Sequence, residues 1–443
     1  MTGACVRLKK SGAALFVRHR HMPMLRTIYG RLPASLRLWI SSRVTAWGRT
    51  AIADMRFPDT LAWRQPVELA RPRAGSLGYL ESDGLNVFGF FDGRFGLAES
   101  ARLYTRALLE CGVPLAIHNL PRPAEHDGGD REFDGLYSSD MPYPVSLVFA
   151  NPGQLSAADL ARIRARTSDN LIVGCWFWEL PRIPNAWQAA LADVDAVLVA
   201  SEFIEKAMIG ASDKPVLRVP VPIAPRADSG LSRADFGLRD DVYVFLTSFD
   251  YHSSFARKNP LGAVQAFREA FPAGDEAVAL LVKSTHAREH PFAAHALLSA
   301  ADGDPRIIFV DQNIDAAHRR ALQRCCDAYL SLHRAEGFGL GMAEFALTGK
   351  PVIATGWSGS VDFLAGSPYA VDCRLRELRN DEYPHSHGEV WAEPDLAHAA
   401  RLMKKAVDGP RRMPSAVAEF LDPLRNSESL VRAIESIRRQ AHA

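Results

Sequence analysis

The chain has 443 residues, of which 47% are apolar and 23% are charged, and its formal net charge is +1. This composition is typical of a soluble globular protein of two or three domains, and the near-neutral charge argues against a nucleic-acid-binding protein. The six cysteines form no Cys-x-x-Cys pair, which argues against a zinc site or a disulfide framework and favours reduced thiols in a cytoplasmic protein.

Residues 1–56 differ from the rest because they hold eleven lysines and arginines and one acid, Asp54. Such a segment could attach to an anionic membrane surface, pack as a helix on the later domains, or form a disordered basic arm. Trp39 and Trp47 would serve as apolar anchors, although Arg43 falls on the same helical side. The apolar stretch near the start is too short for the apolar core of a signal peptide, and no stretch of the chain reaches the roughly 20 apolar residues of a membrane span. We interpret residues 1–80 as a basic extension and a proline-containing linker.

A regular alternation of strands and helices begins at Leu85. Short apolar runs predict strands at 85–91, 113–117, 145–150, 171–177 and 196–200, with helices at 97–111, 156–166 and 185–192. This alternation predicts a parallel, doubly wound α/β domain over residues 81–223. Gly93 and Gly96 fall in its first strand-to-helix connection, but their spacing is not the dinucleotide pattern, so no NAD site is predicted.

Aromatic residues surround one acid in the middle of this half. Trp178 immediately precedes Glu179, and Phe177 and Trp187 lie nearby in the sequence. Sugars stack their C–H faces on aromatic rings while their hydroxyls bond to acids, so this group suits a saccharide. It equally suits the edge of a hydrophobic core.

A proline-rich break at 220–225 separates this domain from a second alternating run over residues 224–407. The run predicts strands at 242–247, 278–283 and 307–310 and helices at 260–271, 291–300 and 316–325. Asn259 and Pro260 are a favourable N-cap and first residue for the 260–271 helix. Arg257 and Lys258 would then lie in the loop before it, where they could neutralise a diphosphate or remain a solvated basic pair.

The next segment, residues 327–363, predicts a strand, a glycine turn, a helix and a second strand. The turn is Gly337-Phe338-Gly339-Leu340-Gly341, and the strands are 328–332 and 352–354. A helix N-terminus after such a turn favours phosphate oxygens. Glu336 precedes the turn and Glu344 lies about one turn inside the helix, so both can face the crevice where open α/β sheets bind ligands.

The segment HRAEGFGLGMAEFALTGKPVIATGWSG resembles the donor-site signature of retaining glycosyltransferases of family 4, which have a GT-B fold. Glu336 and Glu344 match its two glutamates, which are separated by seven residues. The resemblance implies that Glu336 contacts the donor sugar, that Glu344 holds the nucleotide ribose, and that Gly337, Phe338, Gly339 and Leu340 border the donor. Lys258 matches the family's phosphate-binding lysine most closely.

The resemblance also leaves questions open. The family's usual arginine is replaced by Ser253, so either Arg257 or Lys283 would supply the second phosphate charge. By the same resemblance, the loop with Gly93 and Gly96 would lie over the donor phosphates, and Glu179 with Trp178 would lie on the acceptor side. The implied fold has two Rossmann-like domains across a cleft, with the helices of residues 408–443 crossing back to the first domain.

The implied function is transfer of a sugar, with retention, from a UDP- or GDP-sugar to a saccharide or lipid-linked acceptor in bacterial glycan synthesis. No DxD-type pair is present in a suitable loop, so we expect neither a metal nor another cofactor. The alternative is a non-catalytic sugar-nucleotide-binding partner of a glycan assembly complex. The basic extension suggests a cytoplasmic protein that works at the inner face of the membrane.

Overall fold

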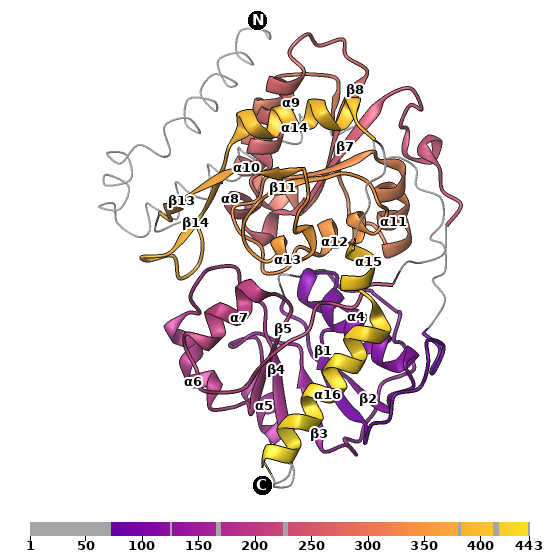
Figure 1. The fold of residues 1–443 in the computed structure, drawn as a ribbon, viewed down its shortest axis with the longest axis vertical. Helices are drawn as coiled ribbons and strands as arrows, with labels where there is room; N and C mark the ends of the chain where they lie inside the picture. Colours follow the sequence, from indigo (N-terminus) through magenta and orange to yellow (C-terminus); the bar gives the residue numbers. More distant parts are fainter. Residues whose placement is uncertain are drawn as a thin grey trace, which may run out of the picture.

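The computed structural model describes residues 72–124, 126–164, 170–224, 229–379, 382–410 and 416–441. These residues form two α/β domains, one above the other in Figure 1, and each domain contains a parallel sheet of six strands. Among the helices of this part of the chain, none is both long and apolar enough to cross a lipid bilayer. The basic segment 1–56 lies outside the described residues, so its three interpretations stay predictions.

The first domain has the strand order β2-β1-β3-β4-β5-β6. Its strands are β1 (Leu85–Gly89), β2 (Leu115–Asn119), β3 (Val145–Val148), β4 (Leu171–Cys175), β5 (Ala196–Val199) and β6 (Val216–Arg218). Its helices are α4 (Gly96–Glu110), α5 (Ala157–Arg164), α6 (Gln188–Leu191) and α7 (Glu202–Ile209). Strands β1, β3, β4 and β5 are short and almost wholly buried, which is why they appear in the sequence as mainly apolar runs, whereas β6 is partly exposed.

The second domain has the strand order β12-β11-β10-β7-β8-β9. Its strands are β7 (Tyr243–Asp250), β8 (Val278–Thr285), β9 (Ile307–Asp311), β10 (Ala328–Ser331), β11 (Val352–Thr355) and β12 (Ala370–Val371). Its helices are α8 (Phe255–Lys258), α9 (Pro260–Ala270), α10 (Pro291–Ala301), α11 (Ala316–Cys325), α12 (Leu340–Ala346), α13 (Val361–Leu364) and α14 (Leu396–Asp408). The predicted α/β class is therefore confirmed in both halves.

The order of the strands reverses beside the first strand of each domain. In the first domain β1 lies between β2 and β3, and in the second β7 lies between β8 and β10. Ligands of open α/β sheets bind beyond the carboxyl ends of the strands at such a reversal. The topology thus marks one edge of each sheet as a place for a site.

Residues 255–258 correct the sequence interpretation, which placed Arg257 and Lys258 in a loop. They form the short helix α8, which begins where the Ser254 hydroxyl accepts a hydrogen bond from the N–H of Arg257 at 3.3 Å. Asn259 ends α8 in a left-handed conformation, with φ +49°, and its side chain caps α9 by accepting a hydrogen bond from Gly262 at 3.2 Å. Asparagine tolerates this backbone geometry better than most residues.

A two-stranded antiparallel sheet, β13 (Cys373–Glu377) and β14 (Val390–Pro394), was not expected from the sequence. Its Trp391 is fully buried, and the guanidinium groups of Arg334 and Arg376 lie 5.7 and 5.2 Å from the ring centroid. Arg334 also donates two hydrogen bonds to Glu393 at 2.9 and 2.8 Å. This hairpin is therefore anchored to the chain two residues before Glu336.

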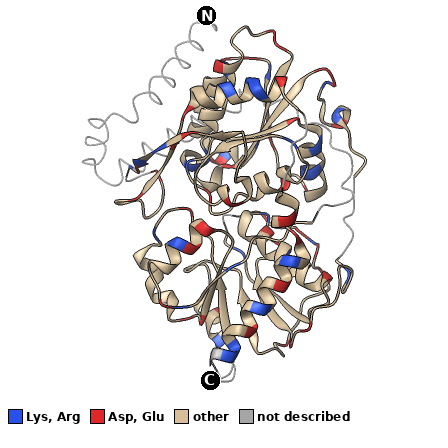
Figure 2. Ribbon diagram, in the orientation of Figure 1, with Lys and Arg blue, Asp and Glu red and all other residues tan. Residues whose placement is uncertain are grey.

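The chain returns to the first domain through α15 (Val417–Phe420) and α16 (Pro423–Ala441). Helix α16 lies along α4 in Figure 1, and its Leu430 and Ile434 belong to the same hydrophobic core as Tyr104 of α4. At the crossing, the N–H of Ile223 donates a hydrogen bond to the carbonyl of Leu421 at 2.9 Å. Acidic and basic residues are interspersed over both domains and along α16 (Figure 2).

Candidate functional site

A cleft of about 1020 Å³ is lined by residues of both domains. The first domain contributes the loop after β1, including Gly96, and the segment after β4, including Phe177 and Glu179. The second domain contributes the carboxyl ends of β7, β8 and β10 and the glycine turn before α12. Both strand-order reversals therefore open on one cavity, which is large enough for a nucleotide and a sugar.

Glu336 lies on the wall of this cleft that the second domain contributes and is only 7% exposed. Its carboxylate forms ion pairs with the Lys258 ammonium and with Arg257 Nη1, the latter at 3.1 Å. Burial would raise the pKa of Glu336, but Lys258 and Arg257 outweigh that effect and lower it to about 2. The carboxylate is thus ionised and held in one orientation.

Arg257 is only 4% exposed and is committed to protein partners. Besides Glu336, it donates hydrogen bonds to the carbonyls of Ala335 and Ser253 at 2.9 and 3.1 Å, and it lies 3.7 Å from Glu179. Although burial opposes it, these acids raise the pKa of Arg257. Arg257 therefore holds the carboxylates of Glu336 and Glu179 near each other.

Lys283 has a different environment on β8. It lines the cleft with an exposed fraction of 8%, and its ammonium makes no hydrogen bond or ion pair to another residue in the described ranges. Burial lowers the pKa of Lys283 to about 8, and the attraction of Asp311 offsets only part of that effect. Of the two residues that the sequence left open for the second phosphate charge, Lys283 is the one whose ammonium forms no ion pair with an acid among the described residues.

Glu344 lies in α12 and also lines the cleft. Both of its carboxylate oxygens accept hydrogen bonds from Arg319, at 3.0 and 3.2 Å, and one also accepts from Gln323 at 3.1 Å. Arg319 comes from α11, and no motif in the sequence pointed to it. A single arginine in an amphipathic helix does not reveal in the sequence that it will pair with an acid 25 residues later.

The glycine turn between the two glutamates contacts the first domain. The carbonyl of Gly337 accepts a hydrogen bond from the Ser201 hydroxyl at 2.6 Å, and a Cβ atom on Gly337 would lie 2.9 Å from the carbonyl oxygen of Trp178. Gly339 has φ +95°, a conformation that favours glycine, and it precedes Leu340, the first residue of α12. The first N–H groups of α12 have no acceptor within the helix and border the cleft with Phe338.

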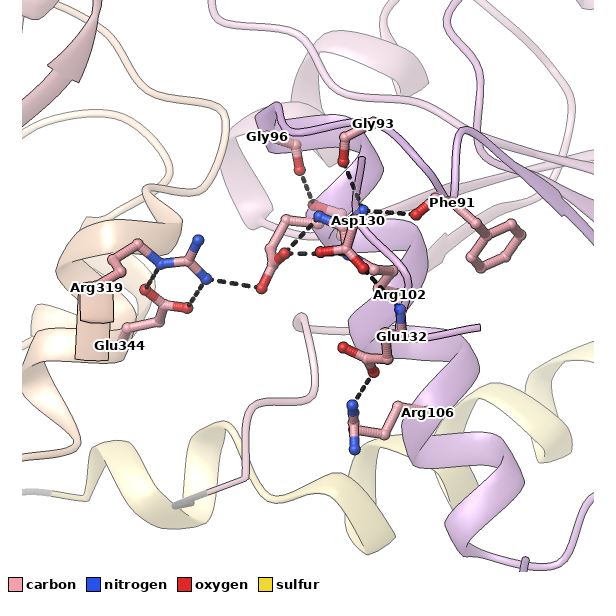
Figure 3. A network of polar contacts seen from close by, with 11 residues as sticks. Phe91, Gly93, Gly96, Arg102, Arg106, Asp130, Glu132, Arg319 and Glu344 are labelled. Carbon is pink, nitrogen blue, oxygen red and sulfur yellow. Dashed lines mark hydrogen bonds and ion pairs between the residues drawn. The ribbon is translucent and has the colours of Figure 1, made fainter. Parts of the chain in front are cut away.

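The two glycines of the loop after β1 occupy different positions (Figure 3). Gly96 lines the cleft at the start of α4, and its carbonyl accepts a hydrogen bond from Ser100 at 3.0 Å. Gly93 is buried, and its carbonyl accepts a hydrogen bond from Arg102 at 2.6 Å. Gly93 is thus part of the framework of the loop.

Of the two residues that the resemblance places on the acceptor side, Glu179 lines the cleft and Trp178 does not. The indole of Trp178 is buried and donates a hydrogen bond to the carbonyl of Arg182 at 2.7 Å. It packs against Trp187, with 5.0 Å between the ring centroids. The neighbouring ring, Phe177, lines the cleft instead, in the segment that follows β4.

The loop of the unexpected hairpin supplies a residue that sequence reasoning missed. The Tyr383 hydroxyl donates a hydrogen bond to the carboxylate of Glu179 at 2.6 Å. The two residues are 204 positions apart, so only the tertiary structure reveals the pair.

Histidines and acids meet between the two domains, next to Asp250 and Asn313, which line the cleft. His286 contacts Asp250 of its own domain at 2.7 Å and Asp127 of the first domain at 3.1 Å, and Asn313 donates to Asp127 at 2.7 Å. Asp250, His252 and His286 are close enough to be considered as metal ligands. However, the rings of His252 and His286 stack at 4.1 Å with an interplanar angle of 12°, so their lone pairs lie in parallel planes and do not converge on one ion. We interpret the group as a polar contact between the domains.

Comparison with solved structures identifies similar folds. The trehalose-6-phosphate synthase OtsA matches with a TM-score of 0.53 and 13% identity, covering 81% of this chain and 99% of that one. A UDP-forming trehalose-phosphate synthase from Burkholderia xenovorans matches with a TM-score of 0.53 and 15% identity, covering 82% of this chain and 100% of that one. Sucrose-phosphate synthase from Thermosynechococcus elongatus matches with a TM-score of 0.51 and 16% identity, covering 82% of this chain and 98% of that one.

These similarities establish the fold, and the expected GT-B arrangement of two Rossmann-like domains is confirmed. No protein-family model matches the chain. No curated protein matches it by sequence either.

Proposed function

We propose that this protein is a glycosyltransferase that moves a sugar from a nucleotide-sugar donor to a saccharide or lipid-linked saccharide acceptor. The observation that carries the proposal is that Glu336, Glu344, Lys258 and Lys283 line one cleft at the strand-order reversal of the second domain. A ribose, a diphosphate and a sugar need acids for their hydroxyls and cations for their phosphates. The similar structures, which are named as synthases of sugar phosphates, are consistent with this chemistry.

The donor would lie with its ribose on Glu344 and its sugar hydroxyls on Glu336. Its diphosphate would lie between Lys258, Lys283 and the first N–H groups of α12. Rupture of the anomeric C–O bond leaves negative charge on the diphosphate, and fixed cations in a cleft stabilise that charge without reorganisation. The two lysines can thereby fill the place that a divalent cation takes in other transferases.

The acceptor would approach from the first domain, past Glu179 and Phe177. The resemblance to family 4 supports attack on the same face of the sugar as the departing phosphate, with retention of the anomeric configuration. In that mechanism the leaving phosphate oxygen takes the proton of the acceptor hydroxyl. Glu179 would bind acceptor hydroxyls, because Tyr383 and Arg257 already fix its orientation.

The test is a panel of UDP- and GDP-sugars offered to the purified protein with EDTA present, with thermal stabilisation and slow donor hydrolysis as readouts. Glu344→Ala should weaken donor binding by about 1–3 kcal/mol, the usual result of removing the partner of a bonded hydroxyl. Glu336→Gln should lower turnover more than affinity. Glu269→Gln, an exposed acid on α9, is the control.

Unchanged affinity and rate in both site variants would overturn the assignment. Loss of hydrolysis on chelation, restored by Mn²⁺ or Mg²⁺, would show instead that a metal holds the diphosphate.

We also propose that residues 1–56 attach the protein to the inner face of a membrane. The support is their sequence alone, with eleven basic residues and two tryptophans. Each basic residue near an anionic surface contributes on the order of 1 kcal/mol, so a few would suffice at moderate salt. The full chain should co-sediment with anionic but not neutral vesicles, and a version starting at Phe57 should sediment with neither. Equal behaviour of both forms would refute the attachment.

A further inference from the structure

Three charged side chains form a continuous bridge across the cleft (Figure 3). Arg319 of α11 lies between Glu344 of α12, in the same domain, and Glu99 of α4, in the first domain. Its Nη2 donates to Glu99 at 2.9 Å and to Glu344 at 3.0 Å, while its Nε donates to Glu344 at 3.2 Å. One guanidinium therefore connects the two walls of the site.

The bridge leaves Glu344 able to bind a ligand. Its Oε2 accepts two hydrogen bonds, from Arg319 and Gln323, but its Oε1 accepts only one from the described residues. A carboxylate oxygen can accept two, so one position on Oε1 remains for a hydroxyl from the cleft. Because the guanidinium is planar and binds both oxygens, it fixes the plane of the carboxylate as well as its charge.

The bridge continues into the loop after β1. The other oxygen of Glu99 accepts hydrogen bonds from Arg102 at 2.6 and 3.2 Å. Arg102 is 4% exposed, and its Nη1 donates to the carbonyls of Phe91 and Gly93 at 2.9 and 2.6 Å. The backbone of residues 91 and 93 is thus held in part by a side chain that pairs with Glu99.

Charged groups this well buried are costly when one partner is removed, because the remaining charge is left in a poorly solvated site. The side chains of Glu344 and Glu99 are only 7% and 14% exposed. A hydroxyl that binds Glu344 therefore acts on a network whose members constrain one another, and not on an isolated acid.

We propose that Arg319 is a positioning residue that orients Glu344 for the nucleotide ribose and, through Glu99 and Arg102, couples nucleotide binding to the loop at residues 91–96. This inference rests on the proposed function. Nucleotide bound to Glu344 therefore stabilises the loop at residues 91–96, which the resemblance to family 4 places over the donor phosphates. Because such coupling is reciprocal, loosening the loop also weakens nucleotide binding.

The experiment measures nucleotide affinity by calorimetry with UDP, GDP, ADP and dTDP as probes, in wild type, Glu99→Gln and Arg319→Lys. Glu99→Gln keeps the shape of the side chain but removes its charge. Arg319→Lys keeps the charge between two acids, which protects folding, but cannot bind both oxygens in one plane. Glu110→Gln, on the same helix but paired with Arg106, is the matched control.

Both bridge variants should bind the preferred nucleotide at least about fivefold more weakly, and the control should match wild type. Glu99→Gln should add nothing further in a Glu344→Gln background. Hydrogen exchange distinguishes coupling between the nucleotide and the loop from a purely structural role of the bridge. Nucleotide should slow amide exchange at residues 91–96 in wild type and in Glu110→Gln, but not in the bridge variants.

Two negative outcomes are distinguishable. If wild type binds none of the four nucleotides, the proposed function and this inference both fail. If wild type binds and Glu344→Ala does not, while the bridge variants keep full affinity and full protection of the loop, only the coupling is overturned.

Discussion

Replacing Lys283 with methionine should stabilise the unliganded protein and weaken nucleotide binding at the same time. The pKa of Lys283 falls from 10.5 to about 8, chiefly because burial disfavours the charged ammonium. At about 1.36 kcal/mol for each pKa unit, the folded protein loses about 3 kcal/mol by carrying this charge at neutral pH. Methionine has a similar length and no charge, so Lys283→Met should recover much of that free energy of unfolding.

The dependence on pH has a defined sign. Between pH 8 and 10.5 the unfolded lysine is protonated and the folded one is not, so the unfolded state binds more protons. The stability of wild type therefore rises with pH across this interval. The advantage of Lys283→Met should be greatest below pH 8 and should vanish above pH 10.5.

The assay is urea unfolding of wild type, Lys283→Met and Lys404→Met, with and without saturating UDP or GDP. Lys404 is exposed on α14 and serves as the control. Nucleotide should stabilise wild type and the control more than Lys283→Met, because in the proposed function the diphosphate pairs with this lysine. If Lys283→Met is destabilised, or if nucleotide stabilises all three equally, Lys283 is a structural residue and the reasoning is wrong.

Three further results are expected. Lys258→Ala should lower kcat by about 100-fold or more, since it removes a fixed cation at the leaving group, and unchanged turnover would contradict that role. Gly359→Ala should lower the free energy of unfolding by about 1–3 kcal/mol, because its Cβ would lie 2.0 Å from the carbonyl oxygen of Gly337, whereas Gly210→Ala has room and should be neutral in the same urea titration. Although burial opposes it, hydrogen bonds to acids raise the pKa of His286, so its stabilisation is full below about pH 6.5 and is lost as the pH rises. His286→Gln should therefore lose more stability at pH 5.5 than at pH 8.5, and equal losses would show that the histidine's charge is irrelevant.

The sequence predicted the elements whose signals are local. Buried strands of four to eight residues appear as apolar runs, so most strands of both sheets could be placed from them, as at β4 and β8, whereas the shorter strands β6 and β12 were not predicted. The Asn259-Pro260 pair predicted the start of α9 because capping depends on adjacent residues. The helix α8 was missed because its single turn is stabilised by Ser254, whose left-handed backbone has no signature in the sequence.

The geometry of the site could be predicted only in part. Glu336 and Glu344 were identified from the segment around the glycine turn, and Lys258 from its place before the start of α9. All three line the same cleft. The partners that orient them come from distant parts of the chain, such as Arg319 for Glu344 and Tyr383 for Glu179. Trp178 does not line the cleft, because an aromatic run does not reveal which of its rings will face a cavity and which will be buried.

The return of the chain at Leu421 has a mechanical consequence for the cleft. One linker alone would let the second domain swing in any direction, but the backbone crosses between the domains twice. The two crossings lie side by side, since Ile223 and Leu421 share a backbone hydrogen bond. Two neighbouring crossings restrict the relative rotation of the domains more than a single linker would, and so help to hold the two walls of the cleft in register.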